Sequence, residues 1–177
     1  YSDFVVLSDK QLAGRGRYNR PWASGEGNLA STFCLDTNPR NAMLYLPFLA
    51  NTLVRFCREC GVESAIVKWP NDVLINGKKL SGMLAEYDSI TNHLLLGIGL
   101  NVVCAPSIGD NRNESISLAD VGIHTSVDEM LLKFCEVICS VENNIGVFKK
   151  QILSDLVRFG YPIGSSLEVT AHGAIYR

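Results

Sequence analysis

Several features that mark common functional classes are missing from this chain. Only 19% of its 177 residues are charged and the formal net charge is −2, so no excess of positive charge indicates a nucleic-acid binder. No uninterrupted apolar run is long enough to span a membrane. We therefore expect neither nucleic acid nor membrane among its partners. Apolar residues make up 47% of the chain, which is enough for a sizeable core in one domain or in one domain plus a fragment.

Familiar catalytic and nucleotide-binding motifs are also absent. The chain has no G-x-x-x-x-G-K-[ST] phosphate loop, no G-x-S-x-G nucleophile elbow and no H-E-x-x-H metal motif. The pairs Gly14/Gly16 and Gly97/Gly99 lack the third glycine of a dinucleotide fingerprint. The three histidines are scattered and show no metal-ligand spacing. Any chemistry must therefore depend on other residues.

The six cysteines include a C-x-x-C pair, Cys57 and Cys60, and a second pair four residues apart, Cys135 and Cys139. No second C-x-x-C or histidine pair completes a zinc site. The pattern is typical of small buried hydrophobic residues in a reducing cytoplasm, which is where we expect the protein. A zinc or redox role for Cys57 and Cys60 stays open.

Short apolar runs between turn residues predict strands, and Asn76-Gly77 is the strongest hairpin signal in the chain. Strands joined by hairpins, with helices grouped together, indicate an α+β fold with a mixed, largely antiparallel sheet backed by helices. The expected strands cover residues 4–7, 29–35, 66–69, 73–75, 79–87 and 93–102, and a small β unit begins at 167–176.

Helix signals accompany these strands. Pro39 can occupy the first helical position and Gly61 can end the same helix. Ser126-x-x-Glu129 is a capping box that predicts the start of another helix. We expect a separate helix over 147–159.

The first segment that indicates function runs from Gln11 to Trp22. It places Arg15, Arg17 and Arg20 on a glycine-bearing loop without an acidic residue. Guanidinium groups bind phosphate and carboxylate oxygens, and glycines let backbone N–H groups approach a ligand closely. This segment predicts a site for a polyanion.

The second segment, Lys68-Trp69-Pro70-Asn71-Asp72 followed by Gly77–Gly82, adds lysines and one carboxylate. Activation of a carboxylate by ATP requires cations that hold two anions together, with Mg²⁺ beside them. Lys68, Lys78 and Lys79 supply positive charge, and Asp72 is an oxygen ligand suited to Mg²⁺.

Each of these residues also has a purely structural interpretation. The arginine-rich segment can be a solvated loop, and the lysines can solubilise a hairpin. Trp22 and Trp69 can be packing residues, Asp72 can shape a turn, and Gly82 can mark a bulge.

A third segment, Gly97-Ile98-Gly99-Leu100-Asn101-Val102, follows the first two in order. Together the three segments closely resemble the catalytic domain of the biotin–protein ligase family, from about Phe4 to Leu118. The resemblance implies a sheet backed by helices and a C-terminal SH3-like β barrel. It places the catalytic domain at residues 1–164 and a truncated start of the SH3-like domain at 165–177.

The resemblance also implies a role for each matching residue. The implied catalytic residues are Lys79, Arg15 and Arg17. The implied biotin-binding residues are Gln11, Gly14, Arg15, Gly16, Arg17, Lys79, Gly82, Gly97 and Gly99. The implied ATP- or adenylate-binding residues are Arg20, Trp22, Lys68, Asn71 and Asn101, and Asp72 is the implied Mg²⁺ ligand. The family's Ser-Thr-rich segment, which binds the biotin ureido ring, and the helix-turn-helix of its repressor members have no counterpart in this sequence.

The function that the resemblance implies is activation of biotin by ATP to biotinyl-5′-AMP, followed by transfer to a lysine of a biotin carboxyl carrier domain. ATP, biotin and Mg²⁺ are the expected ligands, and the family also includes homodimers that join sheet edges. Three alternatives stay open: a lipoate–protein ligase, a non-catalytic binder of biotin or a nucleotide, and a nucleic-acid-binding module.

Overall fold

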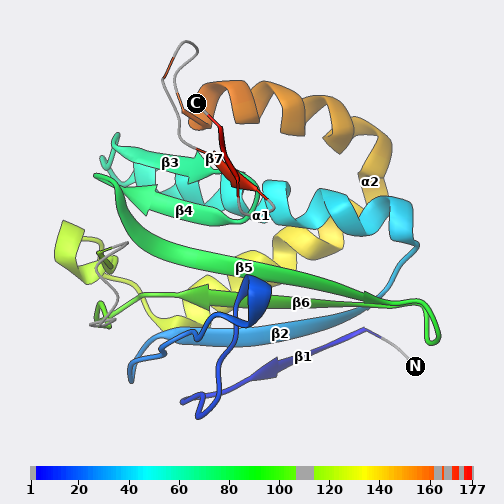
Figure 1. Ribbon diagram of the computed structural model, residues 1–177, viewed down its shortest axis with the longest axis horizontal. Coiled ribbons are helices and arrows are strands. Elements are labelled where there is room, and N and C mark those ends of the chain that lie inside the picture. Colours follow the sequence, from blue (N-terminus) through cyan, green and yellow to red (C-terminus); the bar gives the residue numbers. More distant parts are fainter. Residues whose placement is uncertain (1–2, 107–113, 162–164, 166–168, 172–173, 177) are drawn as a thin grey trace.

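The computed structural model describes residues 3–106, 114–161, 165, 169–171 and 174–176. A six-stranded sheet forms its centre, in the order β1-β2-β6-β5-β4-β3 (Figure 1). The strands are β1 (Phe4–Leu7), β2 (Leu29–Asp36), β3 (Ala65–Lys68), β4 (Asp72–Ile75), β5 (Lys78–Asp88) and β6 (His93–Leu100). Each neighbouring pair is antiparallel, which confirms the largely antiparallel sheet; none of these described strands is parallel to its neighbour.

The turn between β4 and β5 forms as the sequence predicts. Asn76 and Gly77 both adopt the left-handed conformation, with φ of 51° and 78°. These values suit the tight hairpin turns that match the right-handed twist of the strands. The turn brings the two lysines of β5, Lys78 and Lys79, back alongside β4.

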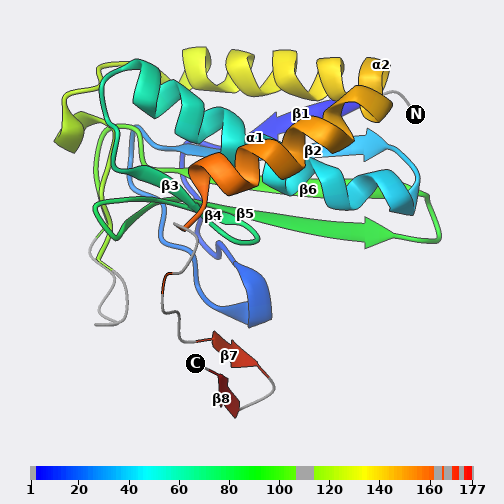
Figure 2. The same cartoon turned by 90° about the horizontal axis from the view of Figure 1, so that it is seen from above.

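Two helices, α1 (Pro39–Glu59) and α2 (Val127–Phe159), cover one face of the sheet (Figure 2). Both begin where the sequence signals place them. The side chain of Asn38 caps α1 by accepting the N–H of Asn41. At the start of α2, Ser126 and Glu129 exchange the two hydrogen bonds of a capping box.

The separate helix expected over 147–159 is wrong, because α2 is one continuous helix from Val127 to Phe159. A single glycine such as Gly146 costs about 1 kcal/mol in a helix interior, which alone does not end a helix. Buried residues on both sides of it, including Phe134, Ile138, Ile152 and Phe159, keep one apolar face packed along the molecule.

The core lies between the helices and the sheet. Tyr45, Leu49 and Leu53 of α1 and Phe134 of α2 are completely buried there. On β6 the even-numbered residues from Leu94 to Leu100 face this core. Because successive strand residues point to opposite faces, Gly97 and Gly99 lie on the sheet face away from the helices.

Smaller elements complete the fold. Short 3₁₀ helices cover Arg17–Asn19 (η1) and Ala119–Val121 (η2), the first of them within a segment expected to be a loop. Strands β7 (Val169–Ala171) and β8 (Ala174–Tyr176) form a separate hairpin, while 167–168 and 172–173 lie outside the described residues. The domain boundary at 164/165 and the SH3-like character stay predictions. Within the described part of the chain, no helix is both long and apolar enough to cross a membrane.

Candidate active site

The floor of the candidate site is made of glycines from two neighbouring strands. Gly82 of β5 pairs with Gly99 of β6, and Gly82 also pairs with Asp72 of β4. Gly82 therefore keeps regular register, and the irregularity in this part of the sheet lies instead at Val73/Leu74. The bulge interpretation of Gly82 is wrong. Because glycine has no side chain, these positions leave room on the sheet face that the two helices do not cover.

The indole of Trp22 lies directly against this floor. A Cβ built on Gly99 would come 2.4 Å from Trp22 Cε2, and one on Gly82 would come 3.1 Å from Trp22 Cζ3. Gly97 is different, because a Cβ there would meet its nearest neighbour, the Leu84 oxygen, at 3.7 Å. Only glycine at position 99 allows Trp22 to approach the sheet this closely. Trp22 does not cover Gly97, so the sheet surface there has room for another group.

Trp22 reaches the floor at the end of the arginine loop, residues Gly14–Trp22. This loop folds back on itself through two backbone hydrogen bonds, Trp22 N to Gly14 O and Gly16 N to Arg20 O, each 2.8 Å long. A Cβ on Gly14 would lie only 2.6 Å from Trp22 O, so the loop can close this tightly only with glycine there.

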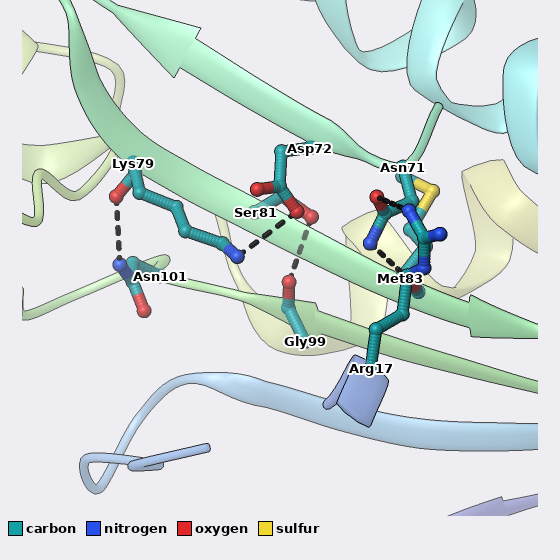
Figure 3. A network of polar contacts seen from close by, with 8 residues as sticks. All are labelled: Arg17, Asn71, Asp72, Lys79, Ser81, Met83, Gly99 and Asn101. Atoms are coloured by element: carbon teal, nitrogen blue, oxygen red, sulfur yellow. Dashed lines mark hydrogen bonds and ion pairs between the residues drawn. The ribbon is translucent and has the colours of Figure 1, made fainter. Parts of the chain in front are cut away.

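Two arginines expected at the site each have a partner on or next to the sheet. The guanidinium of Arg15 lies 2.6 Å from a carboxylate oxygen of Glu86. Arg17 Nη1 donates to the amide oxygen of Asn71 at 3.3 Å (Figure 3). The arginines thus hold the arginine loop over β4 and β5.

Lys79 is more enclosed than these two arginines. Its side chain is 24% exposed, and Nζ lies 2.9 Å from Asp72 Oδ1 and 5.5 Å from the centre of the Trp22 ring. The contact with Asp72 has the distance of an ion pair but not the geometry of a hydrogen bond. The ammonium therefore lies between a carboxylate and an aromatic ring, beside the glycine floor.

Asn101 fixes the backbone of Lys79 from the other side. Its Nδ2 donates to the Lys79 carbonyl at 3.3 Å and to the Ile116 carbonyl at 3.0 Å. The segment around Ile116 adds a hydrogen bond from Ile116 N to Lys79 O and one from Lys79 N to Glu114 O. The Oδ1 atom of Asn101 is buried and has no hydrogen-bond donor among the described residues.

Not every expected residue joins this cluster. Lys68 lies one strand further out, on β3, in register with Asp72. Lys78 turns to the rim, where its ammonium binds Glu114 at 2.7 Å, and this contact raises the pKa of Lys78. Arg20 lies at the tip of the arginine loop, where its guanidinium lies 6.0 Å from the centre of the Tyr18 ring.

The sequence interpretation missed two residues of this region, Glu86 and Asn28. Glu86 lies four residues after Gly82 on the same face of β5, and this strand alternation is the signal that could have identified it. Asn28 gives no such signal, because its partners are more than 70 residues away in the chain. Gln11 is half-buried beside Gly14, where a Cβ would meet its Oε1 at 2.8 Å.

No metal cluster of three or more His, Cys, Asp or Glu side chains occurs in the described part of the chain. Cys57 is buried in α1, and desolvation raises the pKa of its thiol to about 12. Cys60 and Cys139 are exposed, so the expectation that both pairs are buried is wrong for these two residues.

A sequence model of the biotin/lipoate A/B protein ligase family matches residues 1–101. The chain is 37% identical over 113 residues to the bifunctional ligase/repressor BirA of Bacillus subtilis, covering 58% of this chain and 34% of that protein. It is also 37% identical over 113 residues to the biotin–[acetyl-CoA-carboxylase] ligase of Paracoccus denitrificans, covering 59% of this chain and 46% of that one. The chain therefore spans less than half the length of these relatives.

Solved structures show the same arrangement. The biotin protein ligase of Aquifex aeolicus in complex with biotin and ATP superposes with a TM-score of 0.78 at 27% identity, covering 96% of this chain and 73% of that one. The biotin protein ligase of Leishmania major in complex with biotin superposes with a TM-score of 0.76 at 22% identity, covering 98% of this chain and 77% of that one, which shows a shared fold.

Proposed function

Because the chain belongs to the biotin/lipoate A/B protein ligase family, we propose that it activates biotin with ATP to biotinyl-5′-AMP and transfers the biotinyl group to a lysine of a biotin carboxyl carrier domain. One observation carries this proposal: Lys79, paired with Asp72, lies against Gly82 and 5.5 Å from the centre of the Trp22 ring, and that ring lies on both Gly82 and Gly99. A flat apolar wall beside a shielded cation suits a ligand with an apolar body and one carboxylate.

The first half-reaction joins two anions. A carboxylate oxygen of biotin attacks the α-phosphorus of ATP, the bond to the β-phosphate oxygen breaks, and pyrophosphate leaves. The barrier is lowered chiefly by holding the anions together and by neutralising charge that develops at the α-phosphate. Lys79 is placed to do this between the two groups, while Arg15 and Arg17 of the arginine loop hold the oxygens and close the loop.

In the second half-reaction the neutral amine of the acceptor lysine attacks the carbonyl carbon of the mixed anhydride. An amide forms, the bond to the AMP oxygen breaks, and AMP leaves with the electron pair. The amine proton passes to solvent or to the departing phosphate. Trp22 covers the floor where the anhydride lies, which limits its hydrolysis by water.

The remaining roles follow from position. We assign Gln11, Gly14, Gly16 and Gly97 to the biotin side, and Arg20, Lys68, Asn71 and Asn101 to the nucleotide side. Trp22 contacts Gly82 and Gly99, the glycines that we assign to biotin. We therefore assign its ring to the boundary between the biotin side and the nucleotide side of the site, and not to the nucleotide side alone. Asp72 is a carboxylate, a ligand type suited to Mg²⁺, and its Oδ1 is already paired with the ammonium of Lys79. A Mg²⁺ ion held there would share this carboxylate with Lys79 and would supply charge neutralisation at the phosphates.

The proposed partner is a carrier domain with an accessible lysine. The proposed setting is the cytoplasm, where Cys57 and Cys60 stay as thiols. A homodimer that joins sheet edges is consistent with β1, whose four residues are all exposed at one edge of the sheet.

The test is biotin-dependent exchange of labelled pyrophosphate into ATP by this polypeptide, which needs no acceptor. We expect exchange with biotin and Mg²⁺, and none without biotin. Exchange with lipoate in place of biotin would replace the proposal with a lipoate-activating enzyme, since the family includes both classes. Biotin binding without exchange would indicate a non-catalytic binder. Salt-dependent DNA binding with neither would indicate a nucleic-acid-binding module.

A further inference from the structure

A buried asparagine outside the assigned site holds the end of β6. Asn28 is 4% exposed and lies immediately before β2. Its Oδ1 accepts three successive backbone N–H groups, from Val102 at 3.0 Å, Val103 at 3.0 Å and Cys104 at 3.2 Å. Its Nδ2 donates back to the Cys104 carbonyl at 2.8 Å. The side chain of Asn28 therefore provides hydrogen-bond partners for three N–H groups and one carbonyl of this turn.

The neighbouring backbone is shaped for this contact. Gly27 has φ of 80°, and a Cβ there would come 3.0 Å from the Val103 side chain. A Cβ on Gly25 would come 2.4 Å from Cys104 Sγ. The loop of residues 25–28 and the turn of residues 102–104 therefore touch closely along their length, and this contact would not survive larger side chains.

The turn held by Asn28 follows directly after Asn101. The backbone of Asn101 donates from its N–H to Leu80 O at 3.0 Å, and its carbonyl accepts from Leu118 N at 3.0 Å. Its side chain bridges the Lys79 and Ile116 carbonyls, which leaves the buried Oδ1 without a donor. A buried amide oxygen without a donor is unfavourable, so we expect it to accept a ligand N–H group.

We propose that Asn28 is a positioning residue that sets the direction of Asn101 Oδ1, so that this oxygen accepts a hydrogen bond from the exocyclic amine of the adenine base. The inference rests on the proposed function, because it requires ATP at the Asn101 side of the site. Asn28 acts on nucleotide selection through the turn of residues 102–104 and does not touch the ligand. Biotin, which we assign to the side of Gln11, Gly14, Gly16 and Gly97, is bound independently of Asn28.

Two substitutions at this position separate positioning from general stability. Asn28→Ala leaves three N–H groups, one of them buried, and one carbonyl without their partner, so the turn moves and Asn101 loses its direction. Asn28→Asp keeps an oxygen that can accept the three N–H groups, but it replaces the donation to the Cys104 carbonyl by a second oxygen that faces this carbonyl. Asn51→Ala is the matched control: Asn51 is equally buried, at 2% exposed, and lies in α1 on the other side of the sheet.

The experiment measures the KM for ATP in pyrophosphate exchange, the dissociation constant of biotin without nucleotide, and the melting temperature of each variant. Asn28→Ala should raise the KM for ATP on the order of tenfold, the effect of one lost hydrogen bond, with biotin affinity within about twofold of the parent. Asn28→Asp should give a KM between those of the parent and of Asn28→Ala, because it keeps the acceptor but not the donor of the amide. Asn51→Ala should change neither constant, whatever it does to the melting temperature.

A second nucleotide tests the contact itself. Purine ribonucleoside triphosphate lacks the exocyclic amine, so its KM should be the same in the parent and in Asn28→Ala. If Asn28→Ala does not fold, Asn28→Ser, which retains one hydroxyl acceptor, takes its place in both assays. A residue that only stabilises the fold would weaken both nucleotides and biotin together.

The inference and the proposed function fail differently. If the parent is active and the folded Asn28→Ala or Asn28→Ser variant keeps the parental KM for ATP, the inference is overturned and the proposed function is not. A parallel loss of ATP and biotin affinity in Asn28→Ala also overturns the inference alone. A parent without pyrophosphate exchange overturns the proposed function, and the inference falls with it.

Discussion

At the scale of single residues, some residues of the candidate site contribute charge and others contribute only its shape. Lys79 contributes charge, whereas Gly82 and Gly99 contribute only the absence of a side chain. The two kinds of residue should respond differently to substitution. Charge that acts in a transition state affects the rate, whereas a missing Cβ controls which groups can lie on the floor.

Lys79→Ala should remove most adenylate formation, by about 10²–10³-fold in rate, because the ammonium acts on charge that develops during the reaction. It should also lower the melting temperature, because it leaves the largely buried carboxylate of Asp72 without its cation. Pyrophosphate exchange and a thermal melt check both parts. The control is Lys78→Ala, which removes the neighbouring lysine that binds Glu114 at the rim. Equal activity of Lys79→Ala and the parent would contradict the assigned role.

Gly99→Ala should displace Trp22, because the new Cβ would come 2.4 Å from its ring. In a Trp69→Phe background, Trp22 is the only remaining tryptophan, so its emission should shift to longer wavelength as the ring enters water. Gly97→Ala is the matched control, since its Cβ meets nothing closer than 3.7 Å and should leave the spectrum unchanged. If the emission spectrum of Gly99→Ala equals that of the Trp69→Phe parent, Trp22 does not lie on this floor.

At the scale of elements, the arginine loop and the start of α2 show two ways of ordering a chain segment. The arginine loop has few apolar residues and depends on backbone hydrogen bonds and on Arg15 and Arg17. Two of its residues, Tyr18 and Asn19, have φ of 58° and 56°, which non-glycine residues adopt at a cost. The start of α2 depends instead on its capping box.

The arginine loop should be cut by trypsin without ligand and protected with it. Glycines raise the entropy lost on ordering, and the contacts of Arg15 with Glu86 and of Arg17 with Asn71 are solvent-exposed and therefore weak, so phosphate oxygens should hold the closed loop more firmly. Limited digestion with and without biotin plus ATP checks this, with cleavage after Lys10, just outside the loop, as the internal reference. A loop that already resists trypsin without ligand would be a preformed wall.

The capping box should make the stability of the protein depend on pH through Glu129. Hydrogen bonds from Thr125 and then from Ser126 lower the pKa of this carboxyl. A lowered pKa in the folded state means that the stabilisation is present above the unfolded value, about pH 4.3, and is lost as pH falls through the folded value. Glu129→Gln should therefore reduce the stability difference between neutral and acidic pH, as measured by urea unfolding.

Glu136→Gln, a charge-matched change further along α2, is the control for this experiment. It removes a carboxylate from the same helix without touching the capping box. If both variants show the same pH dependence as the parent, the cap contributes nothing measurable.

At the scale of the whole molecule, the far end of α2 is tied to α1. Arg55 of α1 lies 2.8 Å from Asp155 of α2, and the aspartate side chain is only 9% exposed. The pair joins residues 100 positions apart in the chain. It therefore helps to keep the continuous α2 packed over the sheet.

Arg55→Met should destabilise the fold by about 1–3 kcal/mol, because it leaves a buried carboxylate without its partner. For a chain of this length that corresponds to a melting temperature lower by roughly 2–4 °C per kcal/mol. The double variant Arg55→Met/Asp155→Leu should recover most of the loss, since no charge is then left buried. A double variant as unstable as the single one would show that packing, not the charge, is at issue.

The sequence by itself determined the features that depend on neighbours in the chain. Asn76-Gly77 forces a hairpin through its own backbone preferences, and Ser126 and Glu129 cap a helix from three residues apart. The glycine and cation segments could be recognised because each is a short continuous run. Their grouping at one site followed from the resemblance to a family and not from spacing.

The tertiary structure alone decided what depends on distant strands. The register of β5 and β6 aligns Gly82 with Gly99, and only then can Trp22 lie across both. The pairing of Arg15 with Glu86 spans 71 residues, and Asn28 binds a turn 74 to 76 residues away. The continuity of α2 through Gly146 was decided by packing on both sides of it. Such contacts depend on the sum of many weak interactions over the whole fold, which no local pattern encodes.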